Sequence, residues 1–335
     1  MDIWSSLERP FLILAPMEGV TDLPFRQVIA RAGRPDLFFT EFTNVSSYAS
    51  AKGRANALER LKVSDTDSPI IAQIWGKNPE HFSFIAKDLE NLGFSGIDLN
   101  FGCPDRHVIA AGGGSAMIRT PELAVECYRQ AKSATSLPVS IKTRLGYTSP
   151  TEYRAWLSAL LREHPAALTV HLRTKKEMSK VPAHYELIPS LLALRAELSP
   201  ETKLIINGDI PDRAAAMKLH AQYPDLDGFM IGRGVFKNPY CFIDHLATRD
   251  ELLDLLLFHL EKFDEANASK SNLSEPDERQ NKTTEPRPKS FEPLKHYFKI
   301  YLHSFAGASD LRARLMDTHS TAEARTVLSH FFETN

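Results

Sequence analysis

The sequence predicts an α/β protein: a (β/α)8 TIM barrel followed by a small C-terminal helical domain. Eight short apolar runs recur over the first 246 residues, and segments with helix-start signals separate them. Parallel strands need crossover connections, and eight strand–helix units close a barrel. Beyond about residue 246 the strand-like runs stop and amphipathic helical patterns replace them. We therefore expect the barrel over residues 1–246 and the helical domain over residues 247–335.

The predicted strands share a short length and a content of β-branched and aromatic residues. They are Phe11–Ala15, Leu37–Phe42, Ile70–Trp75, Gly96–Phe101, Val139–Arg144, Leu168–Leu172, Leu204–Asn207 and Gly228–Gly232. Between them, Asn78 and Thr120 each precede a proline that the first turn of a helix tolerates, so both are predicted helix caps. The alternation alone also fits an open doubly wound sheet, which is the alternative.

Three amphipathic segments predict the helical domain: Glu251–Phe263, Pro293–Phe305 and Thr321–Phe332. Residues 266–290 between the first two are rich in Ser, Asn, Lys, Glu and Pro and contain almost no apolar residue. Such a segment cannot bury enough surface to offset its chain entropy. We predict a disordered insertion at 266–290.

Charge and composition exclude some classes of protein. The 335 residues carry a net charge of −2, so any contact with RNA has to come from a local basic patch. The first ten residues lack the basic start and apolar core of a secretory signal. No apolar run approaches the roughly 20 residues that span a bilayer. We expect a cytoplasmic protein with no membrane contact.

In a barrel of this type the active site lies at the carboxyl ends of the strands. The polar segments that end the predicted strands are Ala15–Val20, Gln73, Asn100–Pro104, Lys142–Arg144, His171 with Arg173, Asn207–Asp209 and Gly232–Gly234. The glycines after strands seven and eight lie at the usual phosphate corner, where backbone N–H groups can approach an anion. A phosphorylated cofactor is favoured over the simpler interpretation that these glycines only make turns.

Lys142 lies within a predicted strand and would point into a mostly apolar barrel unless an anion lies at the rim. If a flavin occupies the site, a lysine beside its N1/C2-carbonyl edge stabilises the negative charge of the reduced ring. Gln73 and Asn207 would supply orienting hydrogen bonds. The alternative is a solvated lysine at a strand end.

The three cysteines lie far apart, with no CxxC pair and no zinc-ligand spacing, so we expect no disulfide framework and no metal. Cys127 and Cys241 fall in helical patterns, where buried structural thiols are the default. Cys103 instead lies between Gly102 and Pro104 at a strand end, on the expected active rim. A thiol with an ordinary pKa near 8.5 is largely protonated at neutral pH and can donate a proton.

Five motifs follow one another along the barrel: Ala15–Asp22, Asn100–Pro104, Gly112–Met117, Ile141–Arg144 and Ile231–Gly234. Together they resemble the successive signatures of the tRNA-dihydrouridine synthases and cover essentially the whole barrel. The Gly-Cys-Pro element followed by the small-residue loop is the most specific of them.

This resemblance implies an FMN cofactor that NADPH reduces. The implied FMN contacts are Pro16, Met17, Glu18, Gln73, Lys142, His171, Asn207, Gly208, Asp209, Gly232 and Arg233. In that family the reduced flavin passes a hydride to C6 of a uracil ring and a cysteine, here Cys103, protonates C5 from the other face. The same comparison places Asn100, Arg144 and Arg173 against the uridine.

A uridine inside a folded tRNA has to turn out of its stack before it can enter a barrel mouth, so the enzyme must grip the surrounding RNA. Lys295, His296 and Lys299 fall at near-helical spacing in the helical domain, with Tyr297 and Tyr301 interleaved. Such a cluster suits phosphate contacts, although a solvated helix face is the alternative. We expect tRNA as the partner and a monomeric protein.

Some details refine the resemblance. Leu172 stands where a small residue is usual, and Lys175–Ala183 does not reproduce the family's loop, so we expect an altered uridine pocket. The run Met17–Gly19 and the triple glycine at 112–114 resemble the bacterial C-type enzymes, which modify tRNA position 16.

Two other functions fit parts of the pattern. An FMN barrel acting on a small pyrimidine, similar to dihydroorotate dehydrogenase, shares a related Asn-x-x-Cys-Pro element and a strand-five lysine, but it would have no use for the helical domain. A non-catalytic RNA-binding barrel would have little reason to keep Cys103 and Lys142.

Overall fold

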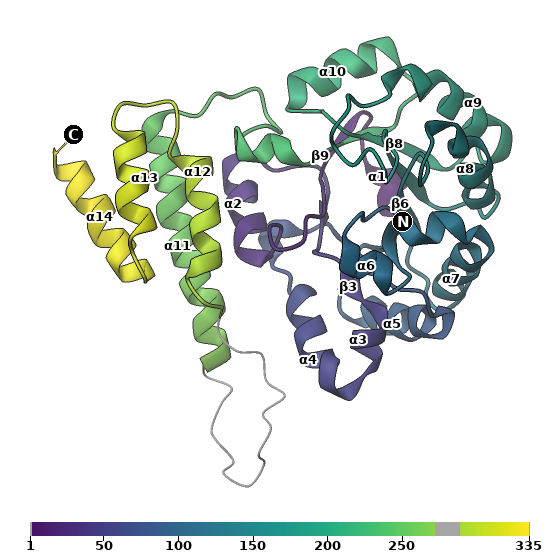
Figure 1. Cartoon of the computed structure of the whole chain (residues 1–335), viewed down its shortest axis with the longest axis horizontal. Helices are drawn as coiled ribbons and strands as arrows, with labels where there is room; N and C mark the ends of the chain where they lie inside the picture. Colours follow the sequence, from purple (N-terminus) through teal and green to yellow (C-terminus); the bar gives the residue numbers. More distant parts are fainter. Residues whose placement is uncertain (1, 272–288, 335) are drawn as a thin grey trace, which may run out of the picture.

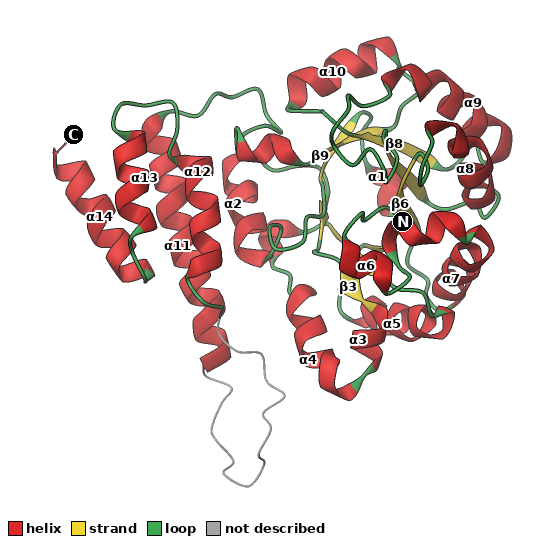
Figure 2. Cartoon of the chain, in the orientation of Figure 1, coloured by secondary structure: helices red, strands yellow, loops and turns green. Residues whose placement is uncertain are grey.

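The computed structural model describes residues 2–271 and 289–334. Among them, nine parallel strands form one sheet in the order β1-β9-β8-β7-β6-β5-β4-β2, with β3 also paired to β4. The strands are β1 (Phe11–Leu14), β2 (Phe38–Phe39), β3 (Thr43–Asn44), β4 (Ile70–Trp75), β5 (Gly96–Asn100), β6 (Val139–Arg144), β7 (Ala167–His171), β8 (Lys203–Asn207) and β9 (Gly228–Ile231). β1 pairs with β9 on one side and bridges from Ile13 to Leu37 on the other, which closes the sheet (Figure 2). The barrel prediction is confirmed and the open sheet is wrong.

Helices surround the strands on the outside of the barrel (Figure 1). They are α2 (Leu23–Gly33), α3 (Val45–Ala49), α4 (Ala51–Arg60), α5 (Pro79–Asn91), α6 (Arg106–Ala110), α7 (Pro121–Ser133), α8 (Tyr153–Leu161), α9 (Ile188–Leu198) and α10 (Arg213–Gln222). Both predicted cap positions are correct, since α5 begins after Asn78 and α7 after Thr120. Only Asn78 caps with its side chain, whose Oδ1 accepts from the backbone N–H of Glu80 at 3.0 Å.

The predicted second strand, Leu37–Phe42, is shorter in the structure, since β2 covers only Phe38–Phe39 and β3 lies beyond the predicted end. Thr40 still continues the ladder, because its N–H donates to the carbonyl of Ile71 at 3.0 Å. The side chain of Glu41 then turns away to accept the N–H of Gly19 at 2.7 Å. The strand resumes only at Thr43.

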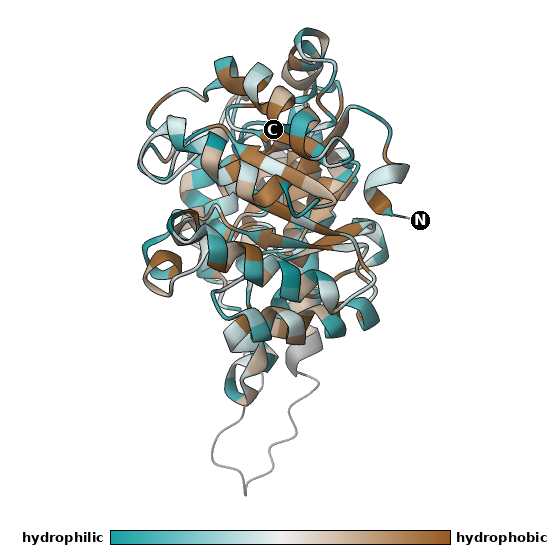
Figure 3. Ribbon diagram, turned by 90° about the vertical axis from the view of Figure 1, so that its right-hand side faces the viewer, coloured by the Kyte–Doolittle hydropathy of each residue, from teal (hydrophilic) through white to brown (hydrophobic). Residues whose placement is uncertain are grey.

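The amino-terminal half of the barrel interior is apolar and closed. The short helix α1 (Ile3–Ser6) places Trp4 there with 1% of its surface exposed, within 6.0 Å of the Phe11 ring centroid. Ile13 and Met230 belong to the same buried cluster. In Figure 3 the apolar residues gather on the strands and the inward helix faces. Because this end is filled, space for a ligand remains at the carboxyl end of the strands.

The carboxyl-terminal segment is helical, as expected, and packs against the outside of the barrel. It contains α11 (Arg249–Ser271), the 3-10 turn η6 (Glu292–Tyr297), α12 (Phe298–Tyr301), α13 (Ala308–Met316) and α14 (Thr321–Thr334). α11 lies along α2, and Figure 1 shows α13 and α14 on the far side of α11 and α12 from the barrel. Among the described residues, no helix is both long and apolar enough to cross a bilayer.

Two expectations for this segment need correction. α11 continues to Ser271, so residues 266–271 of the predicted insertion are helical, and Asn267 accepts the backbone N–H of Lys289 at 2.9 Å. Residues 272–288, the rest of that insertion, lie outside the described part of the chain. The helix predicted over Pro293–Phe305 is divided between η6 and α12, and α13 was not predicted.

Candidate active site

A cavity of about 1330 Å³ opens at the carboxyl ends of the strands. Every barrel residue that the sequence assigned to FMN or to the uridine lines it. These residues are Pro16, Met17, Glu18, Gln73, Asn100, Cys103, Lys142, Arg144, His171, Arg173, Asn207, Gly208, Asp209, Gly232 and Arg233. The expected rim therefore exists as one continuous site, although the role of each residue there stays a prediction.

Cys103 is held by its backbone at the end of β5. Its N–H donates to Oδ1 of Asn100 at 2.9 Å, and the N–H of Gly102 donates to the same oxygen at 3.1 Å. Gly114, with φ of 56°, lies so close that a Cβ there would be 2.8 Å from the Cys103 carbonyl oxygen. Burial raises the pKa of the thiol. The sulfur therefore remains protonated at neutral pH, in a fixed place on the cavity wall.

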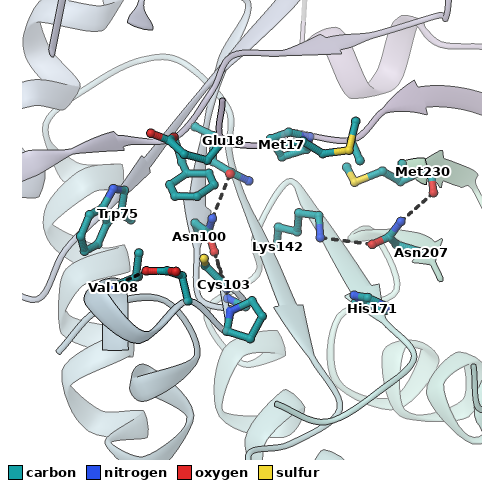
Figure 4. A pocket seen from close by; sticks show the side chains of 18 of the residues that line it. Met17, Glu18, Trp75, Asn100, Cys103, Val108, Lys142, His171, Asn207 and Met230 are labelled. Carbon is teal, nitrogen blue, oxygen red and sulfur yellow. Dashed lines mark hydrogen bonds between the residues drawn. The ribbon is translucent and has the colours of Figure 1, made fainter. Parts of the chain in front are cut away.

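Lys142 occupies the neighbouring strand, β6, across from Asn100 in the register. Its Nζ donates to Oδ1 of Asn207 at 3.3 Å, and Nδ2 of Asn207 donates to the carbonyl of Met230 at 2.7 Å (Figure 4). Burial, followed by the nearby charge of Arg144, lowers the pKa of Lys142 to about 8. A cation bonded to a neutral amide inside a cavity suits an anionic ligand.

The residues at the carboxyl ends of β7, β8 and β9 form the other wall. Burial, reinforced by the surrounding cations, holds the pKa of His171 well below its usual value, so this imidazole is neutral at pH 7. Gly208 has φ of 120°, and a Cβ there would lie 3.1 Å from Cδ2 of His171. The guanidinium of Arg233 is 62% exposed and contacts Asp209 at 3.2 Å. A phosphate binds to backbone N–H groups and to arginine, and the glycine at position 208 and the exposed Arg233 offer both kinds of donor here. The residues present therefore fit a flavin mononucleotide.

Arg144 and Arg173 are buried, with 7% and 2% of their surfaces exposed. Arg144 donates to the carbonyl of Gly102 at 2.8 Å and to those of Thr174 and Met178 at 3.2 and 3.1 Å. Arg173 pairs with Asp209 and donates to the carbonyl of Val181 at 2.6 Å. Both side chains therefore tie the loop 174–183 to the cavity wall. A direct contact with the uridine stays a prediction.

Sequence reasoning missed two charged residues that support the loop after β1. Arg60 of α4 lines the cavity and forms an ion pair with Glu18. Glu41 is 6% exposed, and burial, followed by the charges of Asp22 and Glu18, raises its pKa. Nothing in the local sequence marks either residue, because both reach the loop from other parts of the chain.

The basic residues predicted in the helical domain lie outside this cavity. His296 and Lys299 are exposed, and Nζ of Lys299 lies 5.8 Å from the ring centroid of Phe236, in the turn after β9. Lys295 is only 6% exposed, and its ammonium pairs with Glu292 at 2.8 Å. A phosphate contact by Lys295 is thus disfavoured, because its side chain is buried and its ammonium is already paired with the carboxylate of Glu292.

Comparison with known proteins gives one consistent family. The family model described as "Dihydrouridine synthase (Dus)" matches residues 13–335. Over 332 residues the chain is 48% identical to "Probable tRNA-dihydrouridine synthase 2" of Bacillus subtilis (strain 168), covering 98% of this chain and 96% of the relative. It is 46% identical to "Probable tRNA-dihydrouridine synthase" of Staphylococcus epidermidis, with the same coverage. These names do not mention a C-type enzyme, so that assignment stays a prediction.

Among solved structures, morphinone reductase in complex with tetrahydroNAD aligns with a TM-score of 0.48 and 15% identity, covering 72% of this chain and 87% of that chain. A variant of NCR from Zymomonas mobilis aligns with a TM-score of 0.43 and 14% identity, covering 68% of this chain and 83% of that chain. Over residues 2–271 and 289–334, no group of three or more His, Cys, Asp or Glu side chains is arranged to hold a metal ion.

Proposed function

Because the chain belongs to the dihydrouridine synthase family, we propose that it reduces the C5–C6 double bond of a D-loop uridine in tRNA, with FMN as cofactor and NADPH as reductant. One observation on this chain's own residues supports the proposed chemistry in addition to the family membership. The protonated thiol of Cys103 and the ammonium of Lys142 line the same cavity, as a proton donor and an anion-stabilising cation have to do (Figure 4).

The residues that would hold FMN form two groups, one suited to the flavin ring and one suited to the phosphate. Lys142, Gln73 and Asn207 offer hydrogen bonds and positive charge to the ring, while Gly208 and Arg233 suit the phosphate. When bound, the reduced flavin supplies a hydride to C6 of the uracil. Lys142 would stabilise negative charge on the reduced ring, and the neutral His171 can act as a hydrogen-bond donor or acceptor without adding charge.

Cys103 completes the reaction with a proton. Its thiol donates to C5 of the uracil, and the raised pKa keeps that proton available at neutral pH. Asn100 keeps the sulfur in place by accepting from the Cys103 N–H. The thiol acts as an acid here, so it needs no neighbouring base to form a thiolate.

The target uridine has to leave its stack to enter the cavity, and the helical domain can hold the RNA while it does so. The exposed side chains of His296 and Lys299 lie on that domain, and Lys299 also lies over the ring of Phe236 beside the proposed phosphate corner. Phosphate contacts from these two residues would bring the RNA next to the cavity mouth.

The test is reduction of unmodified tRNA by purified protein with FMN and NADPH, with free uracil and orotate as alternative substrates. We expect dihydrouridine in the tRNA, mapped to one D-loop position, and no turnover of the free pyrimidines. Turnover of a small pyrimidine without tRNA would instead select the dihydroorotate dehydrogenase-like function.

A further inference from the structure

We propose that Asp98 is a positioning residue of this active site: its carboxylate orients Gln73, Gln73 orients Asn100, and Asn100 holds the backbone of Cys103. Asp98 lies on β5, does not line the cavity, and is 0% exposed. The inference deepens the proposed function, but its first step concerns only the protein's own hydrogen bonds.

The chain of hydrogen bonds is continuous from the barrel interior to the cysteine. Nε2 of Gln73 donates to Oδ2 of Asp98 at 2.7 Å, and Nδ2 of Asn100 donates to Oε1 of Gln73 at 3.0 Å. Oδ1 of Asn100 then accepts from the N–H groups of Gly102 and Cys103 at 3.1 and 2.9 Å. Ser140 donates to the other carboxylate oxygen at 2.7 Å and completes its partners.

The donor and acceptor in each of these hydrogen bonds are set by the two ends of the chain of bonds, the Asp98 carboxylate and the backbone N–H of Cys103. A carboxylate only accepts, so Gln73 has to present its NH₂ group to Asp98 and is left with its oxygen toward Asn100. The backbone N–H of Cys103 only donates, so Asn100 has to present its oxygen there and its NH₂ group to Gln73. These hydrogen bonds therefore fix both side-chain amides in one orientation. Without them, either amide could rotate by 180° with little change in its packing, because the amide oxygen and nitrogen are similar in size.

The carboxylate is also ionised when it does this. Burial raises the pKa of Asp98 to about 6, against the opposing effects of the hydrogen bonds from Gln73 and Ser140 and of the charge of Lys142. At neutral pH the group is thus largely an anion, which has no donor of its own. A buried anion two register positions below Lys142 also offsets part of that lysine's positive charge beneath the proposed flavin.

A purely structural role for Asp98 is the competing explanation, and Asp227 supplies the matched control. Asp227 is 1% exposed, accepts the N–H of Leu204 at 2.9 Å, and pairs with Arg9 at 3.3 Å, at the amino end of β9. It lies at the end of the barrel opposite the cavity. Asp227→Asn is therefore the same substitution in an equally buried carboxylate, with no route to Cys103.

The decisive experiment measures alkylation of Cys103 by iodoacetamide in FMN-free protein, resolved from Cys127 and Cys241 by peptide mass spectrometry. We expect Asp98→Asn to change the alkylation rate by roughly threefold or more, since about 0.7 kcal/mol of lost backbone restraint corresponds to that factor. Adding Gln73→Glu should restore the rate, because the introduced amide can donate to the introduced carboxylate, which still accepts from Asn100. Asp227→Asn should leave the rate at the wild-type value.

An unaltered rate in Asp98→Asn, or a change that Gln73→Glu does not reverse, overturns the proposal. If Asp98→Asn does not fold, Gln73→Met breaks the same chain while Asp98 keeps its bond from Ser140, and it has to show the same change. In FMN-loaded protein, Asp98→Asn should also raise the flavin midpoint potential by about 30 mV, the equivalent of tenfold tighter binding of the reduced form. Wild-type protein that binds no FMN would refute the proposed function, whereas the alkylation result would still decide the role of Asp98.

Discussion

The hydroxyl of Tyr297 joins the helical domain to the loop that carries Pro16, Met17 and Glu18, and its removal tests whether that junction matters for the cofactor. The hydroxyl shares its one hydrogen between the carbonyls of Gly19 and Val20, at 3.0 and 2.8 Å. The side chain is 7% exposed, so water cannot readily replace it.

Tyr297→Phe removes this oxygen and little else. The ring keeps its contacts with Phe25 and His259, at centroid distances of 5.0 and 4.8 Å. Loss of the hydrogen bond that this buried hydroxyl makes to the loop costs about 1–2 kcal/mol. If that cost falls on the loop, FMN should bind about five- to thirtyfold more weakly, and the Tm should fall by about 1–2 °C for each kcal/mol.

Quenching of FMN fluorescence on binding measures the dissociation constant, and thermal melting of the FMN-free protein measures the loss of stability. Tyr301→Phe is the matched control, because its hydroxyl contacts Nδ1 of His259 at 2.8 Å and does not touch the loop. We expect that control to lose stability while keeping its FMN affinity. Equal FMN affinity in Tyr297→Phe and wild type would refute the link between the two domains.

Three further predictions follow from the contacts above. The rate of Cys103 alkylation in FMN-free protein should rise with pH through a midpoint above the ordinary thiol value of about 8.5, because burial disfavours the thiolate; a midpoint at or below that value would contradict the assigned acid. Lys299→Ala should weaken tRNA binding and reduce its salt dependence in filter-binding assays, whereas Lys295→Ala should not; an equal loss in Lys295→Ala would restore the sequence-based assignment of that residue. Asp67→Ala should lower the free energy of unfolding in urea by about 3–5 kcal/mol, because it leaves Arg26 buried without its partner at 2.7 Å, and a loss below about 1 kcal/mol would contradict that estimate.

The parts of this protein that local patterns encode were predictable from the sequence. Strand periodicity located the barrel, and the rule that active sites lie at the carboxyl ends of parallel strands placed Cys103, Lys142 and Asn207 around one cavity. Lys142 and Asn207 lie on their strands, and Cys103 follows the end of β5 by three residues.

Contacts between distant segments were not predictable in this way. Arg60 of α4 reaches Glu18 in the loop after β1, and the hydroxyl of Tyr297 contacts Gly19, 278 residues away in the sequence. The spacing of Lys295 with its neighbours indicated an exposed basic face, but packing of η6 buried its side chain. Spacing reports which residues share a helix face, while the surrounding elements decide whether that face meets water.

The central claim is that a bound flavin and the thiol of Cys103 act on opposite faces of one uracil. Anaerobic reoxidation of the reduced flavin by unmodified tRNA, followed by stopped-flow absorbance in wild type and Cys103→Ala, tests it most directly. We predict that both proteins carry FMN and bind tRNA, and that reoxidation in the variant is slower by about 10²–10⁴ because the acid is missing. Equal reoxidation rates in the two proteins would contradict the claim.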